Sequence, residues 1–169
     1  MKVLITYASK HGSTEEIAKA IAAVLAEEIE KAELLAVEDT KGISKYEAIV
    51  LGSAVYAGSW LRAARQFVDN NIQDLESKPL WIFSSGPTGE PDKSSAVEPV
   101  GQGVVELVNK LNPIDHKVFY GKLDKTDLNL AERGILRAVK AEYGDFRDFN
   151  EIDKWAQSIS QNLLEKAND

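Results

Sequence analysis

Short apolar runs alternate along the chain with stretches in which apolar residues recur every three or four positions. The runs are short and rich in Val, Ile and Leu, as is typical of strands buried on both faces of a parallel sheet. The pattern predicts five strands, at residues 2–7, 34–37, 47–53, 80–84 and 116–120, with the second at or near a sheet edge.

Helical spacing fills the intervals between these runs and the end of the chain. It predicts a first helix after Ser13, a second from Trp60 to Leu75 and a third that begins near Glu98. Two more are expected, at about 130–143 and from about Ile152. The residues expected to face the core are Ile17, Ile21, Val24, Leu25 and Ile29; Trp60, Ala64, Phe67, Val68, Ile72 and Leu75; Val100, Val104, Leu107, Val108 and Leu111; and Trp155, Ile159 and Leu163.

The alternation of strands and helices indicates an α/β fold, an open parallel sheet with helices on both faces. At 169 residues the chain fits one domain spanning 1–169. In a sheet of order 2-1-3-4-5, the loops after strands one, three and four are neighbours. Such sheets bind ligands at the carboxyl ends of their strands, so these three loops are the candidate site.

Charge and cysteine content narrow the possible functions. The net charge of -7 argues against nonspecific nucleic-acid binding, which depends on clustered Lys and Arg. Cysteine is absent, which excludes disulfides, thiolate metal sites and a thiol nucleophile. Any redox chemistry must therefore come from a cofactor.

The first strand begins next to Met1, which leaves no room for a signal peptide before it. No apolar run approaches the roughly 18 residues that span a bilayer. We therefore expect a cytoplasmic protein without a transmembrane segment. A peripheral membrane contact and any oligomeric state stay compatible with the sequence.

The loop at residues 9–14 has the composition of an anion-binding corner. A helix start presents unpaired backbone N–H groups and the positive end of the helix dipole. Ser and Thr add hydroxyl donors, and Gly12 allows a close approach of the backbone. Ser13 is expected to be the N-cap, in a capping box with Glu16. A capped helix start with no ligand explains the same residues equally well.

The turn also resembles the phosphate loop of the flavodoxin family, in which hydroxyl residues alternate around a glycine. Ser9, Gly12 and Thr14 match that pattern, whereas His11 stands at a hydroxyl position. Three segments resemble the flavodoxin-domain branch that includes menaquinone-dependent protoporphyrinogen oxidase. They are YASKHGST at 7–14, GKLD at 121–124 and GDFRDF at 144–149.

This resemblance implies a flavodoxin-like three-layer sandwich that holds FMN noncovalently. The first loop would bind the phosphate, and the loops after strands three and four would flank the isoalloxazine ring. The residues implied are Ser9, Lys10, His11, Gly12, Ser13 and Thr14 at the phosphate; Ala54, Val55, Tyr56, Ala57 and Gly58 on one side of the ring; and Ser85, Gly86, Pro87, Thr88 and Gly89 on the other.

Two aromatic residues are candidates to stack on the ring. Tyr56 lies in the middle of a loop and is the favoured one. Trp60 starts an amphipathic helix, which favours core packing instead. The loop at 85–92 has no aromatic residue, which leads to the hypothesis that one flavin face is open to a flat partner such as a quinone or porphyrinogen.

Other motifs give weaker signals. His11 either donates to the phosphate or faces solvent, and His116 is expected to have no role. No metal site is expected, because the two histidines are far apart in sequence and have no partners at ligand spacing. Gly101-Gln102-Gly103 follows no strand and is not a dinucleotide fingerprint.

Taken together, these features predict an FMN-dependent redox protein in which no side chain breaks bonds. The favoured interpretation is an oxidoreductase that passes electrons between its flavin and a quinone or porphyrinogen-type substrate. A flavodoxin-type electron carrier between protein partners is the alternative, and a cofactor-free interaction domain is a third.

Overall fold

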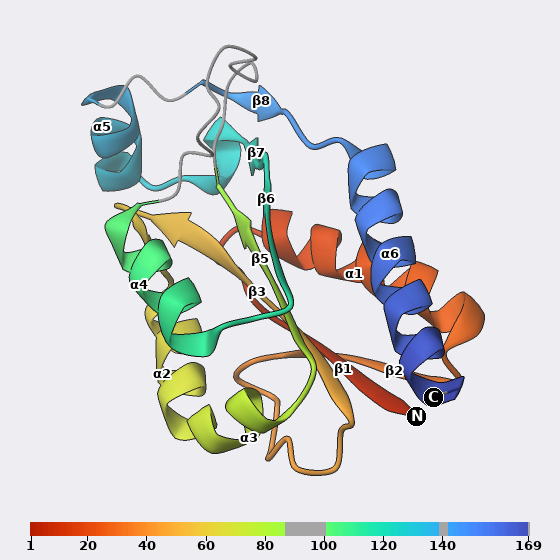
Figure 1. Cartoon of the computed structure of the whole chain (residues 1–169). Helices are drawn as coiled ribbons and strands as arrows, with labels where there is room; N and C mark the ends of the chain where they lie inside the picture. The colour runs from red at the N-terminus through yellow and green to blue at the C-terminus, as the bar shows by residue number, and fades with distance from the viewer. Residues whose placement is uncertain (87–100, 139–141, 169) are drawn as a thin grey trace.

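The computed structural model describes residues 1–86, 101–138 and 142–168, and it has three layers (Figure 1). The central sheet has the order β2-β1-β3-β5-β6, and all neighbours in that series are parallel. This confirms the flavodoxin-like α/β sandwich and the order 2-1-3-4-5 expected for the main strands. The strands are β1 (Lys2–Ala8), β2 (Lys31–Ala36), β3 (Ala48–Tyr56), β5 (Leu80–Ser85) and β6 (Asp115–Phe119).

Helices cover both faces of the sheet (Figure 1). On one face lie α1 (Ser13–Glu28) and α6 (Phe149–Asn168), and on the other lie α2 (Arg62–Asn70), α3 (Ile72–Ser77) and α4 (Gln102–Leu111). Each face has its own apolar core, since a central parallel strand is buried on both sides. Ile49 and Val50, for instance, are both fully buried but belong to different cores.

The prediction of one helix from Trp60 to Leu75 is wrong in two respects. Trp60 belongs to a short strand, β4 (Ser59–Trp60), and the helical part is broken at Asn71 into α2 and α3. Asn71 has a φ of -124°, and its side-chain amide donates to the Phe67 carbonyl at 2.8 Å. That local hydrogen bond competes with the helical pattern at this position.

The loop predicted at 54–59 is a β-hairpin. Strand β3 continues to Tyr56 and then pairs antiparallel with β4. Ala57 and Gly58 form the turn with φ values of 48° and 74°. Positive φ at both central residues matches the twist that a two-residue hairpin requires. Strand β3 can therefore turn directly into β4 without a longer loop.

The capping box predicted at Ser13 is also wrong. Gly12 is the N-cap of α1, in a left-handed conformation with a φ of 82°. The Glu16 carboxylate does not reach back to Ser13 but forms an ion pair with Arg147, 2.7 Å away. A tertiary partner thus replaces the local one.

Beyond β6 the helix predicted at about 130–143 is confirmed as α5 (Leu130–Ala138), and the chain also forms smaller elements that the periodicity did not predict. Strands β7 (Lys122–Leu123) and β8 (Gly144–Asp145) pair antiparallel, and between them lie the short 3-10 helix η1 (Lys125–Asp127) and α5 (Leu130–Ala138). The predicted start of the third helix near Glu98, with Pro99 and Val100, lies outside the described residues. No helix in the described ranges is long and apolar enough to cross a membrane.

Candidate functional site

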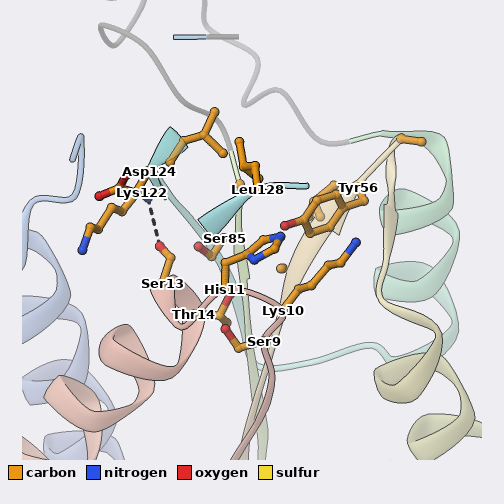
Figure 2. A pocket seen from close by; sticks show the side chains of 16 residues that line it. Ser9, Lys10, His11, Ser13, Thr14, Tyr56, Ser85, Lys122, Asp124 and Leu128 are labelled. Atoms are coloured by element: carbon orange, nitrogen blue, oxygen red, sulfur yellow. Dashed lines mark hydrogen bonds between the residues drawn. The ribbon is translucent and has the colours of Figure 1, made fainter. Parts of the chain in front are cut away.

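A cavity of about 260 Å³ opens where β1, β3 and β5 end (Figure 2). It brings together the three loops that the sequence predicted to be neighbours. The turn before α1 contributes one wall, the β3–β4 hairpin a second, and the end of β5 a third. The residues that line it are Ser9, Lys10, His11, Ser13, Thr14, Ala54, Val55, Tyr56, Ala57, Ser85, Gly86, Gly121, Lys122, Leu123, Asp124 and Leu128.

Most of the site residues expected from the sequence line this cavity. Gly12 and Gly58 do not, although both shape the turns beside it with positive φ. Pro87, Thr88 and Gly89 lie outside the described residues. The segment 121–124 and Leu128 line the cavity but were missing from the expected set. The segment 121–124 could have been predicted from the sequence, because it directly follows the fifth main strand of the sheet.

The turn before α1 is held by hydrogen bonds from two directions. The Gly12 N–H donates to Ser9 Oγ at 3.1 Å, which closes the turn. The Lys122 N–H donates to Ser13 Oγ at 2.9 Å across the cavity edge (Figure 2). Because both hydroxyl oxygens accept these bonds, their O–H groups stay available to donate to a ligand. The first N–H groups of α1 add further donors.

Lys10 and His11 point toward the mouth of the cavity, near Tyr56 (Figure 2). Both contact the Glu132 carboxylate of α5: Lys10 forms an ion pair with it, and His11 Nε2 lies 3.2 Å from Oε1. The hydrogen bond from Lys10 lowers the pKa of Glu132 to about 2. Glu132 therefore carries a full negative charge beside the turn at neutral pH.

The two aromatic candidates lie in different surroundings. Tyr56 is 40% exposed and lines the cavity, with Lys10 Nζ lying 5.6 Å from its ring centroid. Trp60 is 2% exposed, packs in the core and donates from Nε1 to Ser84 Oγ at 2.8 Å. Only Tyr56 is thus placed to contact a ligand in the cavity.

Gly101 and Gly103 have a packing role. A Cβ added at Gly101 would lie 1.9 Å from the Gly58 Cα, and one at Gly103 would lie 2.2 Å from Ser59 Oγ. The start of α4 therefore lies directly against the β3–β4 turn. The Gly-Gln-Gly motif, rejected as a dinucleotide fingerprint, allows this close backbone contact.

His116 lies within β6, and its Nε2 is 3.0 Å from Ser84 Oγ. Burial lowers its pKa. Among the residues that the structure describes, no three His, Cys, Asp or Glu side chains gather as metal ligands would.

A model of the flavodoxin domain family matches residues 4–150. The chain belongs to this family. Solved structures with the same fold include a flavodoxin from the domain Archaea, with 16% identity over 97% of this chain and 99% of that one and a TM-score of 0.63. No curated protein matches at a significant level.

Two further structures are similar to this flavodoxin domain. Rubredoxin oxygen:oxidoreductase from the anaerobe Desulfovibrio gigas is 18% identical over 99% of this chain and 37% of its own, with a TM-score of 0.64. Oxidised flavodoxin 1 from Bacillus cereus is 22% identical over 83% of this chain and 98% of its own, with a TM-score of 0.54. At these identities the similarity shows a shared fold.

Proposed function

We propose that this flavodoxin domain uses the cavity at the carboxyl ends of β1, β3 and β5 to bind FMN and transfers electrons through it. Membership of the family implies FMN as the cofactor. The observation that carries the proposal is the position of a helix N-terminus, free hydroxyls and an exposed tyrosine around one cavity. We propose further that residues 1–169 act as a single domain.

The donor set fits a phosphate at the turn before α1. Ser9 and Ser13 would donate their hydroxyl protons, and the N–H groups of the first turn of α1 would complete the site. Thr14 lines the cavity and is 1% exposed. Lys10 would supply positive charge, and a ring nitrogen of His11 would take the place of the hydroxyl expected at position 11.

The β3–β4 hairpin and the end of β5 would border a flat ring bound in the cavity. Ala54, Val55, Tyr56 and Ala57 would lie along one side, with Ser85 and Gly86 on the other. A Cβ at Gly86 would lie 3.2 Å from both Val55 Cβ and the Val55 carbonyl oxygen, so the two segments are in close contact there and a larger residue would push them apart. Pro87, Thr88 and Gly89 extend the proposed set.

FMN would supply one- and two-electron chemistry, which no side chain of this chain can perform. The side chains would hold and orient the group. Backbone N–H groups beside the ring would tune the redox potential of FMN by donating to the polar edge of the ring.

The substrate that we favour is a quinone or a porphyrinogen-type molecule. The similarity of 7–14, 121–124 and 144–149 to the protoporphyrinogen oxidase branch supports this choice. Tyr56 and Leu128 add aromatic and apolar surface at the cavity, which suits a flat partner.

Two other functions each have an observation in their favour. An electron carrier between proteins is compatible with the size of the chain, which covers 99% of the archaeal flavodoxin. An interaction domain without cofactor is favoured by Glu132, because this carboxylate already forms an ion pair with Lys10 and contacts His11.

A visible absorption spectrum of the purified protein, with FMN added, tests the proposal. Flavin bands and submicromolar affinity are expected, and failure to bind FMN would leave only the interaction domain. The reduced holoprotein is then mixed with a quinone, a porphyrinogen or a cytochrome. Fast turnover with either small molecule favours the oxidoreductase, whereas fast transfer to the cytochrome alone favours the carrier.

A further inference from the structure

The Arg147 side chain is only 3% exposed and lies beside the N-terminal turn of α1. Its Nη1 forms an ion pair with Glu16 at 2.7 Å. Its Nε and Nη2 donate to the two carboxylate oxygens of Asp145 at 2.8 and 2.6 Å, a forked arrangement. Nη1 also lies 3.5 Å from the Ser13 carbonyl oxygen. One buried cation thus joins α1 to β8.

The antiparallel pair of strands β7 and β8 holds Ser13 from its other side. The Lys122 N–H of β7 donates to Ser13 Oγ, and β7 pairs with β8 through Leu123 and Gly144. The Phe146 N–H donates to the Gly121 carbonyl, which ties the chain after β8 to the start of β7. The β7–β8 strand pair therefore orients the Ser13 hydroxyl, and Arg147 connects this strand pair to α1.

Charge gives Arg147 a second effect. Glu16 is in the first turn of α1, where a bound phosphate would lie, and Asp145 is in the adjoining strand β8. An unpaired carboxylate so close would repel a phosphate dianion. The buried guanidinium pairs with both carboxylates and cancels one of their two negative charges, and it does so without facing the cavity, since Arg147 is not among the residues that line it.

We propose that Arg147 is a positioning residue for the phosphate group, so that this chain prefers a phosphorylated flavin to the same flavin without phosphate. It acts by holding the β7–β8 strand pair and Ser13 in place and by pairing with Glu16 and Asp145, which cancels one of their two negative charges. The inference rests on the proposed function, because it assigns the preference to the same site.

The test compares FMN with riboflavin, which has the same ring and no phosphate. Dissociation constants of both are measured by quenching of flavin fluorescence for the wild type, Arg147→Gln and Arg147→Lys. A matched control is Arg65→Gln, which removes the same charge from an exposed position on α2, across the sheet. Far-UV circular dichroism of each variant without flavin checks the fold.

For Arg147→Gln, FMN binding is expected to weaken at least about tenfold, which corresponds to about 1.4 kcal/mol, while riboflavin binding changes less than about twofold. Arg147→Lys keeps the charge and is expected to retain most of the preference. Arg65→Gln is expected to bind both flavins as the wild type does.

A double variant keeps the inference testable if Arg147→Gln folds poorly. In Glu16→Gln/Arg147→Gln the carboxylate in the first turn of α1 is gone and only Asp145 is left without its guanidinium partner, so part of the preference for FMN should return. Equal losses for FMN and riboflavin in the single variant, or no loss of either, would overturn the inference. A wild type that binds neither flavin would instead overturn the proposed function.

Discussion

His116 and Ser84 form a partly buried contact, and the bond from Trp60 to Ser84 indicates its hydrogen-bond direction. Trp60 Nε1 donates to Ser84 Oγ, so the Ser84 hydroxyl is free to donate to His116 Nε2. This assigns neutral His116 to the tautomer with its proton on Nδ1. Protonation at Nε2 would place an N–H where an acceptor is needed.

Stability should therefore fall as the pH is lowered below the ordinary histidine pKa of 6.5. Burial lowers the pKa of His116 in the folded state, so the unfolded chain binds the proton more tightly and acid favours unfolding. Above pH 6.5 this contribution is constant. The measurement is urea unfolding from about pH 7.5 to about pH 5.

His116→Gln is the variant for this prediction and His11→Gln its control. The first should flatten the pH dependence in that window, and the second should leave the His116 contribution in place. An unchanged slope in His116→Gln would assign the acid sensitivity to other groups.

Glu132 provides a second prediction at the residue scale. Its carboxylate caps α5 through the Asn129 N–H at 2.9 Å and also holds Lys10 and His11. Gln can keep the capping contact and loses the charge. Glu132→Gln should therefore strengthen FMN binding by about two- to fivefold, because Lys10 is released toward the phosphate.

The measurement is a fluorescence titration with FMN at low ionic strength, repeated at high salt, where the gain should shrink. Glu165→Gln, an exposed position on α6, removes the same charge elsewhere and should have no effect. Weaker FMN binding in Glu132→Gln would instead make the carboxylate a part of the site.

At the scale of elements, the contact between α4 and the β3–β4 hairpin depends on glycine. Gly101→Ala would place a methyl group 1.9 Å from the Gly58 Cα, and backbone cannot yield as a flexible side chain does. We expect a loss of about 1–3 kcal/mol in the free energy of unfolding, measured with denaturant.

Gly134→Ala is the matched substitution within α5. Within the part of the chain that the structure describes, no atom beyond the chain neighbours and the helix's own backbone lies within 4 Å of the added Cβ; alanine also favours the helix, so a gain of about 0.5–1 kcal/mol is expected. A similar change in stability for both variants would argue against the close contact at Gly101.

The element boundaries show where sequence periodicity stops being informative. Apolar spacing continues from Trp60 to Leu75, yet this segment forms a strand and two helices. Trp60 is buried in either arrangement, so its hydrophobicity does not distinguish them. The choice depends on pairing with β3 and on the amide of Asn71, and both compete with the helix through hydrogen bonds.

At the scale of the molecule, bound FMN should stabilise the whole fold. At a concentration about 100 times the Kd, a ligand that binds only the folded state adds about 2.7 kcal/mol. For a chain of 169 residues this raises the Tm by about 5–10 °C. Far-UV circular dichroism during heating measures the shift.

Riboflavin at the same concentration should give a smaller shift, because it lacks the phosphate that would meet the N-terminus of α1. Equal shifts for FMN and riboflavin would argue against a phosphate site at the turn before α1.

The sequence by itself determined the α/β class through local periodicity, and the resemblance to the flavodoxin family implied the sheet order. Given that order, the rule that ligands bind at the carboxyl ends of parallel strands brings the three loops together, so no distant contact is needed to infer them. The choice of Tyr56 over Trp60 as the aromatic at the cavity could also be inferred, because Trp60 begins an apolar pattern that favours core packing whereas Tyr56 does not.

Only the tertiary structure decided how the turn before α1 is held. Glu16 pairs with Arg147, Lys10 and His11 meet Glu132, and Ser13 accepts from Lys122, all across more than a hundred residues of sequence. A capping box and these long-range partners compete for the same polar atoms. The placement of the β7–β8 strand pair and α5 beside the turn before α1 decides the competition, and sequence spacing carries no information about that placement.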